Sequence, residues 1–391
     1  MTNLNLQSTL RLGAILIFLT LSWPNPAWAS APGLSVENGR FLKDGRPYRG
    51  VGANYFDLFL RVLHNSNDLS SCEGLKKLSA AGIPFVRFAG GGFSASEWRM
   101  WTTNKEQFFR SLDVVVKTAE QAKIGLIPSL FWTQIFPDLV DEPRDQWGNP
   151  GSKTIALMRR YVDDVVGRYK NSPAIWAWEF GNEMSLAADL PNAAQFRKKG
   201  GAERDDLKSA HLVTALSEFA KAVRRADAHR AIISGNSHPR MSAWHNTRER
   251  SWKADSREQT LEIILRDNPA PLDTIGIHFY GDHEVQKEAA AWAKDNVDYL
   301  RTVKELAQKS GRPVFVGEFG LAATDDEAKT RAVFEGLLAA METAQIDLAA
   351  FWVFDFPIQD KDWNATFENS RACMIQLSAE ANRRWNAAAG P

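Results

Sequence analysis

Two glutamates in this sequence each stand just after a hydrophobic run. Glu183 closes the stretch that starts Trp176-Ala-Trp-Glu, and Glu318 follows Pro313-Val-Phe-Val-Gly. A buried strand rarely ends in a charge that nothing uses, because burying an unpaired charge is costly. Two opposed carboxylates can cleave a glycosidic bond, one donating a proton with a raised pKa and the other attacking as an anion. The alternative interpretation is a pair of salt-bridged glutamates at the rim of the fold.

The elements that must position these glutamates alternate along the chain. Eight β-rich runs lie at residues 48–54, 84–88, 125–130, 175–180, 231–234, 274–279, 314–317 and 349–354. Helical patterns come after them at residues 70–81, 106–123, 153–169, 207–226, 257–266, 288–309, 325–342 and 371–385. Eight strands, each followed by a helix, predict an α/β fold with a single (β/α)8 TIM barrel. A doubly wound open sheet would give a similar alternation and is the alternative.

In such a barrel the loops that follow the strands gather at one face, where active sites lie. Strands four and seven face each other across that mouth, so Glu183 and Glu318 are expected to converge. The longer loops at 131–152, 184–206 and 236–256 contain Trp132, Trp147, Trp244 and Trp252. Indole rings exposed on loops can stack on sugar rings, whereas the alternative use is core packing.

The first 29 residues are predicted to be an export signal and not part of the fold. An apolar run from Gly13 to Leu21, too short to span a bilayer, precedes the small-x-small site Ala27-Trp28-Ala29. We therefore expect a secreted or periplasmic protein with no membrane anchor after cleavage near Ala29. Residues 30–391 are expected to form one catalytic domain. This domain opens with a short β-hairpin around Asn38-Gly39.

Composition narrows the class of partner. The chain has 47 basic and 47 acidic residues, so it lacks the basic excess typical of proteins that bind nucleic acids. A neutral substrate suits this balance, and we expect a monomer. The only two cysteines, Cys72 and Cys373, are expected near the starts of neighbouring helices. In an oxidising compartment they could form a disulfide or remain free thiols, and the sequence leaves both open.

Six elements, in order along the chain, resemble glycoside hydrolase family 5, which includes cellulases and β-mannanases and belongs to the clan of 4/7-superfamily barrels. They are the opening from Asn38 to Tyr55, Val86-Arg87-Phe88, Asn182-Glu183, His278-Phe-Tyr280, Glu318 and Trp352. The resemblance spans nearly the whole chain after the export signal. It implies a (β/α)8 barrel that hydrolyses a β-linked glycan by double displacement and needs no cofactor.

The resemblance also implies the catalytic roles. Glu183 would be the acid/base, and Glu318 would be the nucleophile that forms the glycosyl-enzyme. Asn182 would bond the substrate 2-hydroxyl, a contact that strengthens in the transition state. Arg87 would lower the pKa of the nucleophile by its charge, although it could simply pair a buried glutamate. Glu179 is the rival acid, and we interpret it as structural support that needs a cation such as Arg87.

Four further residues are expected to bind substrate or to position the pair. Tyr280 would hydrogen-bond Glu318, His278 would line the reacting subsite, and Trp352 would form its stacking floor. Structural alternatives are a satisfied histidine and a core tryptophan. Trp132 stands after strand three, close to where many family members have a histidine, and this departure bears on the sugar-binding subsites more than on the mechanism.

Other motifs in the sequence are weaker. Gly90-Gly91-Gly92 lacks the spacing of a phosphate-binding loop. His278 and His283 could share a metal, but no carboxylate spacing around them resembles a zinc site, so no metal is expected.

Together these residues favour a retaining, endo-acting β-glycosidase acting on a β-1,4-linked mannan or glucan. A transglycosylase with the same residues is one alternative. A carbohydrate-binding protein without catalysis is another.

Overall fold

The computed structural model describes residues 32–197, 199–281, 291–322 and 326–387 of the chain. Its main sheet has eight strands in the order β8-β7-β6-β5-β4-β11-β10-β9, and the pairs are parallel. These strands are β4 (Gly50–Asn54), β5 (Phe85–Ala89), β6 (Gly125–Phe131), β7 (Ala177–Gly181), β8 (Ala231–Ile233), β9 (Ile275–Phe279), β10 (Val314–Phe319) and β11 (Leu348–Phe351).

The two end strands of this order, β8 and β9, lie against each other. The backbone N–H of Asp273 donates to the carbonyl of Ile232 at 3.2 Å. A methyl group built on Gly276 would lie 3.0 Å from the Ser234 hydroxyl. The sheet therefore has no open edge here, and the (β/α)8 barrel predicted from the alternation is confirmed over the doubly wound sheet.

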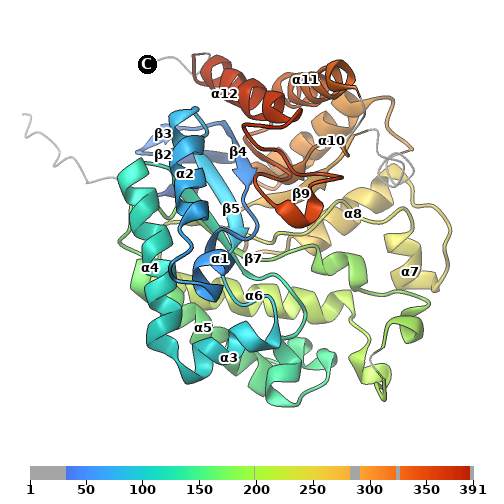
Figure 1. The fold of residues 1–391 in the computed structure, drawn as a ribbon. Helices are drawn as coiled ribbons and strands as arrows, with labels where there is room; N and C mark the ends of the chain where they lie inside the picture. Colours follow the sequence, from blue (N-terminus) through green and yellow to red (C-terminus); the bar gives the residue numbers. More distant parts are fainter. Residues whose placement is uncertain (1–31, 198, 282–290, 323–325, 388–391) are drawn as a thin grey trace, which may run out of the picture. The chain divides into compact units, whose positions relative to one another are not determined.

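One long helix follows each strand, and Figure 1 shows the labelled helices around the central strands. The helices are α2 (Ser70–Ala80), α4 (Lys105–Ala122), α5 (Lys153–Tyr169), α6 (Ser209–Ala226), α8 (Arg257–Asp267), α10 (Asn296–Lys309), α11 (Glu327–Thr343) and α12 (Ala372–Ala387). Their apolar faces pack on the outer side of the sheet in one large core cluster. The expected starts at residues 288 and 325 lie outside the described residues.

A small antiparallel sheet of β1 (Leu34–Glu37), β2 (Arg40–Lys43) and β3 (Arg46–Pro47) precedes the barrel. Its Leu34 and Phe41 are fully buried together with Phe85, Ile127 and other residues that point into the barrel. The backbone N–H of Leu34 also donates to the carbonyl of Trp176, which directly precedes β7. The expected N-terminal hairpin therefore closes the amino-terminal end of the barrel.

Short helices occupy the loops that follow the strands. They are α1 (Leu58–His64), α3 (Ala95–Thr103), α7 (Ala243–Glu249) and the 3-10 turns η1 (Phe136–Val140), η2 (Arg144–Gly148), η3 (Met184–Ala187), η4 (Ala193–Phe196), η5 (Glu203–Asp205) and η6 (Pro357–Gln359). The sequence pattern predicts only loops over these stretches. Three of these short helices, α1, α3 and η6, border the cavity that contains the two glutamates.

Three expectations about the rest of the chain have different outcomes. Cys72 and Cys373 are both buried as free thiols, so the disulfide alternative is not realised in this structure. Among the described residues, no helix combines the length and the apolarity that a membrane span requires. The predicted export signal at residues 1–29 lies outside the described residues and stays a prediction.

Candidate active site

The alternation of strand β5 turns Arg87 into the barrel. Phe85 packs in the inner cluster, whereas Val86 and Phe88 pack in the outer core against the helices. Arg87 is two residues beyond Phe85, so its side chain also points inward, and it is fully buried. A cation there must find buried partners, because an unpaired buried charge is strongly unfavourable.

Four side chains in or just after three strands, β4, β7 and β10, supply those partners. Arg87 Nε donates to both oxygens of Glu179 at 2.8 and 3.0 Å. Arg87 Nη1 donates to Asn54 Oδ1 and to Glu318 Oε1, each at 2.9 Å, and Nη2 donates to Asn182 Oδ1 at 2.8 Å. Glu179, the rival acid, is therefore bound to Arg87 as expected for a supporting residue. Burial raises the pKa of Glu179 above its ordinary value even though the Arg87 charge opposes this.

Glu318 faces inward because strand β10 contains a bulge. Phe315 belongs to the inner cluster, and Val316 and Phe319 belong to the outer core. Strict alternation from Val316 would turn Glu318 outward, but the register to β9 shifts between these two residues. A bulge inserts one residue and reverses the facing of the later residues in the strand. Gly317 is the inserted residue, and its carbonyl accepts a hydrogen bond from Asn54 Nδ2 at 2.9 Å.

Glu183 lies in the turn that ends strand β7, and its backbone is in the left-handed region with φ of 50°. Few residues other than glycine adopt this conformation, and such strained positions cluster at functional sites. The backbone N–H of Glu183 donates to the carbonyl of Gly235 at 2.8 Å, which fixes the turn. The side chain is 31% exposed, against 6% for Glu318.

His278, at the end of β9, lies between the two glutamates. Its Nδ1 is 2.8 Å from Glu183 Oε1 and 3.5 Å from Glu318 Oε2. One oxygen of each glutamate and a His278 nitrogen all lie within 4.8 Å of one another. The two carboxylates expected from the strand ends are thus brought together. His278 is only 1% exposed and lies between the pair as a buried contact, not on the cavity surface that we expected it to line.

The surroundings lower the pKa of Glu183 and raise the pKa of Tyr280. Burial acts to raise the pKa of Glu183, but hydrogen bonds from His278 and Ser237 and the charge of Arg87 outweigh it and lower that pKa below its ordinary value. The raised pKa expected for a proton donor is therefore not a property of the free site. Burial, together with Glu318, raises the pKa of Tyr280 well above its ordinary value. Tyr280 thus keeps its proton and donates it to Glu318 Oε2 at 2.6 Å.

Aromatic side chains surround the pair of glutamates. Trp132 lies over the Arg87 guanidinium, with 4.6 Å from the ring centroid to the central carbon. Trp352 directly follows β11, and its ring centroid is 6.2 Å from that of Trp132. The indole N–H of Trp352 donates to Gln359 Oε1 at 2.8 Å, which fixes the ring. Trp147 lies on the expected loop but serves the alternative use, core packing: it is fully buried and packs with Phe136.

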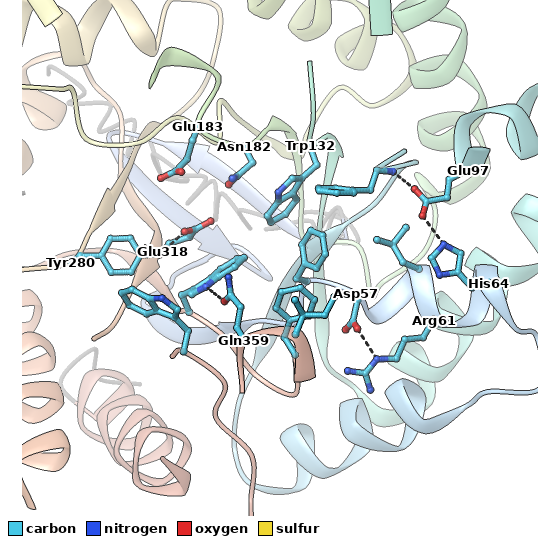
Figure 2. A pocket seen from close by; sticks show the side chains of 17 residues that line it. Asp57, Arg61, His64, Glu97, Trp132, Asn182, Glu183, Tyr280, Glu318 and Gln359 are labelled. Atoms are coloured by element: carbon cyan, nitrogen blue, oxygen red, sulfur yellow. Dashed lines mark hydrogen bonds and ion pairs between the residues drawn. The ribbon is translucent and has the colours of Figure 1, made fainter. Parts of the chain in front are cut away.

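The glutamates and these rings line a cavity of about 720 Å³, shown in Figure 2. Six of its lining residues are among those predicted from the sequence, namely Trp132, Asn182, Glu183, Tyr280, Glu318 and Trp352. The sequence did not point to the others, which are Phe56, Asp57, Leu60, Arg61, His64, Phe93, Glu97, Phe356, Ile358, Gln359 and Trp363. Most of these missed residues follow the first, second and eighth barrel strands, and position after a strand was the signal that could have found them.

Glu183, His278 and Glu318 also have the spacing of a group that could hold a metal ion. The two carboxylates come from strands four and seven, which local spacing around the histidines could not reveal. In the structure these groups are already engaged by Arg87, Tyr280 and one another. The expectation of a site without metal stays a prediction, and His283 lies outside the described residues.

The chain is similar to several known proteins. The model of the cellulase family, glycosyl hydrolase family 5, matches residues 51–355. A putative mannan endo-1,4-β-mannosidase 9 of Oryza sativa subsp. japonica is 24% identical over 349 residues, 80% of this chain and 79% of that protein. Mannan endo-1,4-β-mannosidase A of Podospora anserina is 27% identical over 172 residues, so the match spans 39% of this chain and less than half, 45%, of that protein. The crystal structure of an endo-1,4-β-mannanase from Rhizomucor miehei superposes with a TM-score of 0.63 at 16% identity, covering 90% and 99% of the two chains.

Proposed function

Because the chain belongs to glycosyl hydrolase family 5, we propose that this glycoside hydrolase is a retaining, endo-acting enzyme that cleaves β-1,4-linked mannan. The observation that supports the mechanism is the approach of Glu183 and Glu318, since one oxygen of each lies within 4.8 Å of the other. Retaining enzymes hold their carboxyl groups about 5–5.5 Å apart, whereas inverting ones leave about 6.5–9.5 Å for a water molecule. The choice of mannan over glucan is supported by the names of the two curated relatives described above.

In the first step Glu318 attacks the anomeric carbon and the bond to the leaving oxygen breaks. Glu183 gives its proton to that oxygen, and a glycosyl-enzyme ester on Glu318 results. In the second step Glu183, now ionised, removes a proton from water, and the water oxygen attacks the same carbon and releases Glu318. Two inversions at one carbon retain the β configuration.

The supporting residues act on these two steps. Arg87 and Tyr280 each donate to one oxygen of Glu318 and aim the carboxylate. The amide oxygen of Asn182 accepts a hydrogen bond from Arg87, so the amide nitrogen of Asn182 can donate to the substrate 2-hydroxyl. Glu183 must carry a proton when substrate binds. A sugar that covers the exposed edge of Glu183 removes water from it and raises its pKa, so that Glu183 can hold the proton.

The test is product analysis on mannan, cellulose, mixed-linkage glucan, xylan and aryl β-glycosides. We expect mannan to be cut into oligosaccharides, with the β anomer as the first product seen by proton NMR. An α anomer formed first would overturn the retaining mechanism. Release of mannose alone from chain ends would overturn endo action. Hydrolysis of glucan but not mannan would overturn the proposal that mannan is the substrate. Longer products formed with an added acceptor sugar would identify a transglycosylase.

The hydrogen bond between His278 and Glu183 predicts a pH effect. With Glu183 ionised, His278 Nδ1 must carry the proton and donate it, which favours the charged form of the carboxylate. In His278→Ala this donor is lost, so Glu183 holds its proton more tightly. The basic limb of kcat/KM reports loss of that proton from the free enzyme and should move to higher pH. A basic limb that stays in place, or moves to lower pH, would contradict the assignment. The exposed His229 provides the matched control, His229→Ala.

A further inference from the structure

Glu183 lies in a turn whose strained backbone needs support from outside the turn. Its φ of 50° falls in the left-handed region, and the 3-10 turn η3 follows it directly. A strained conformation of this kind persists only where the neighbouring structure holds it. The last carbonyls of a short helical turn also lack partners within the turn. The loop that follows β8 lies against η3 and meets both needs.

The first residues of this loop bond the turn directly. The carbonyl of Gly235 accepts the backbone N–H of Glu183 at 2.8 Å. Gly235 has a φ of 71°, and a methyl group built on it would lie 1.8 Å from a backbone oxygen at the end of β7, so only glycine allows this close approach. Asn236 Oδ1 accepts the backbone N–H of Ser185 at 3.2 Å. The Ser237 side chain bonds the Glu183 carboxylate.

Arg240, farther along the same loop, binds the turn with its guanidinium. Its Nη1 donates to the carbonyls of Ser185 and Leu186 at 3.1 and 2.5 Å, and its Nη2 donates to the carbonyl of Ala188 at 2.7 Å. Nε and Nη2 also donate to Asn246 Oδ1 of helix α7 at 3.2 and 3.0 Å. A guanidinium has five N–H groups, and these five hydrogen bonds use all of them.

The acceptors of Arg240 are backbone carbonyls and an amide, so these bonds do not make it one half of an ion pair. Burial lowers the pKa of Arg240 below its ordinary value, and the charges of Asp267 and Asp189 only partly oppose this. A cation in such a place is costly. The planar fork of guanidinium donors can fix several carbonyls at set angles, which a lysine ammonium cannot. Arg240 is therefore suited to fixing the shape of the turn.

We propose that Arg240 is a positioning residue for the acid/base: it holds the carbonyls of η3 so that the Glu183 carboxylate points at the leaving oxygen. This inference rests on the proposed glycosidase mechanism and deepens it, since it adds a residue that controls proton donation without touching the substrate. Glu318 is held separately, by Arg87 and Tyr280. Loss of the Arg240 guanidinium should therefore impair proton donation and leave nucleophilic attack intact.

The experiment measures kcat/KM of Arg240→Met on phenyl and dinitrophenyl β-mannobioside, which differ in the leaving group. Phenolate leaves slowly unless Glu183 gives it a proton, whereas dinitrophenolate is stable enough as an anion to leave without one. Because kcat/KM covers only the steps up to the glycosyl-enzyme, the later base role of Glu183 does not enter it. The ratio of the two values, phenyl over dinitrophenyl, should fall at least about tenfold, part of the about 10²–10⁴-fold that general acid catalysis contributes.

Two further variants and a control make this comparison specific. Asn246→Ala keeps the Arg240 guanidinium but removes its acceptor in α7, so the same ratio should fall by a smaller factor. Arg240→Lys keeps the charge without the planar fork and should lower the ratio almost as far as Arg240→Met. The exposed Arg250 provides the matched control, because it donates to the Pro191 carbonyl beyond η3 at 3.5 Å. Arg250→Met should keep the wild-type ratio.

The outcomes separate this proposal from the proposed function. An unchanged ratio in Arg240→Met, including one in which both substrates lose activity equally, overturns the positioning role, while mannan cleavage by the wild type leaves the function standing. A wild-type ratio in Arg240→Lys would assign the effect to charge and also overturn it. Thermal unfolding is measured for each variant, and if Arg240→Met does not fold, the ratio in Asn246→Ala decides. Wild-type protein that cleaves neither mannan nor the aryl glycosides overturns both proposals.

Discussion

Glu318→Ala is expected to lower kcat on mannan about ten-thousandfold or more, the scale seen when a covalent nucleophile is removed. Without this carboxylate no glycosyl-enzyme forms, and the remaining groups can only bind and polarise the substrate. The fold should persist, because Arg87 keeps Glu179, Asn54 and Asn182 as partners. The measurement is steady-state turnover on mannan and on an aryl β-mannoside, with thermal unfolding in parallel.

Added azide distinguishes the two glutamates from each other. In Glu318→Ala, azide can enter the vacated space and attack the anomeric carbon once, which gives a glycosyl azide of inverted, α configuration. In the matched variant Glu183→Ala, an activated aryl leaving group needs no proton, so Glu318 still forms the ester. Azide then gives the retained β product. Near-normal hydrolysis of the aryl glycoside by Glu318→Ala would refute the nucleophile assignment.

The main elements of the fold could be predicted from the sequence because their signals are long and periodic. The predicted barrel strands lie within a few residues of the observed ones, and the helix at 153–169 matches α5 at both ends. Helix α1 has only seven residues, five of them buried. Such a short apolar segment has too little periodicity to be separated from a strand or loop. The positions of Arg61 and His64 in the cavity lining could therefore not be expected from the residue pattern.

The site was predicted in its residues but not in its geometry. Glu318 points inward only because Gly317 forms a bulge in β10, and alternation alone would have turned it outward. The buried position of His278 depends on β9 and β10 lying side by side, with no space for a side chain on Gly317. Trp147 follows the alternative that the sequence left open for its loop tryptophans, since it packs into the core through the turns η1 and η2. These features arise from tertiary packing, which the sequence of one segment does not encode.

Arg87→Met is expected to have the largest effect on stability, about 3–5 kcal/mol, because it removes the cation from two buried carboxylates. The change also releases Asn54 and Asn182, so activity should fall together with stability. Urea denaturation measures the first effect and kcat/KM on mannan measures the second. A variant that unfolds at the wild-type urea concentration would show that the network does not hold the barrel mouth together.

The double variant Arg87→Met/Glu179→Met separates the two roles of Arg87. Replacing a buried ion pair by apolar side chains of similar size is often neutral for stability, whereas removing one partner is not. The double variant should therefore recover much of the lost stability, because Glu179 no longer stays buried without a cation. It should not recover activity, because Glu318 still lacks the donor at Oε1 and Asn182 still lacks its anchor. Recovery of both would make Arg87 a purely structural residue.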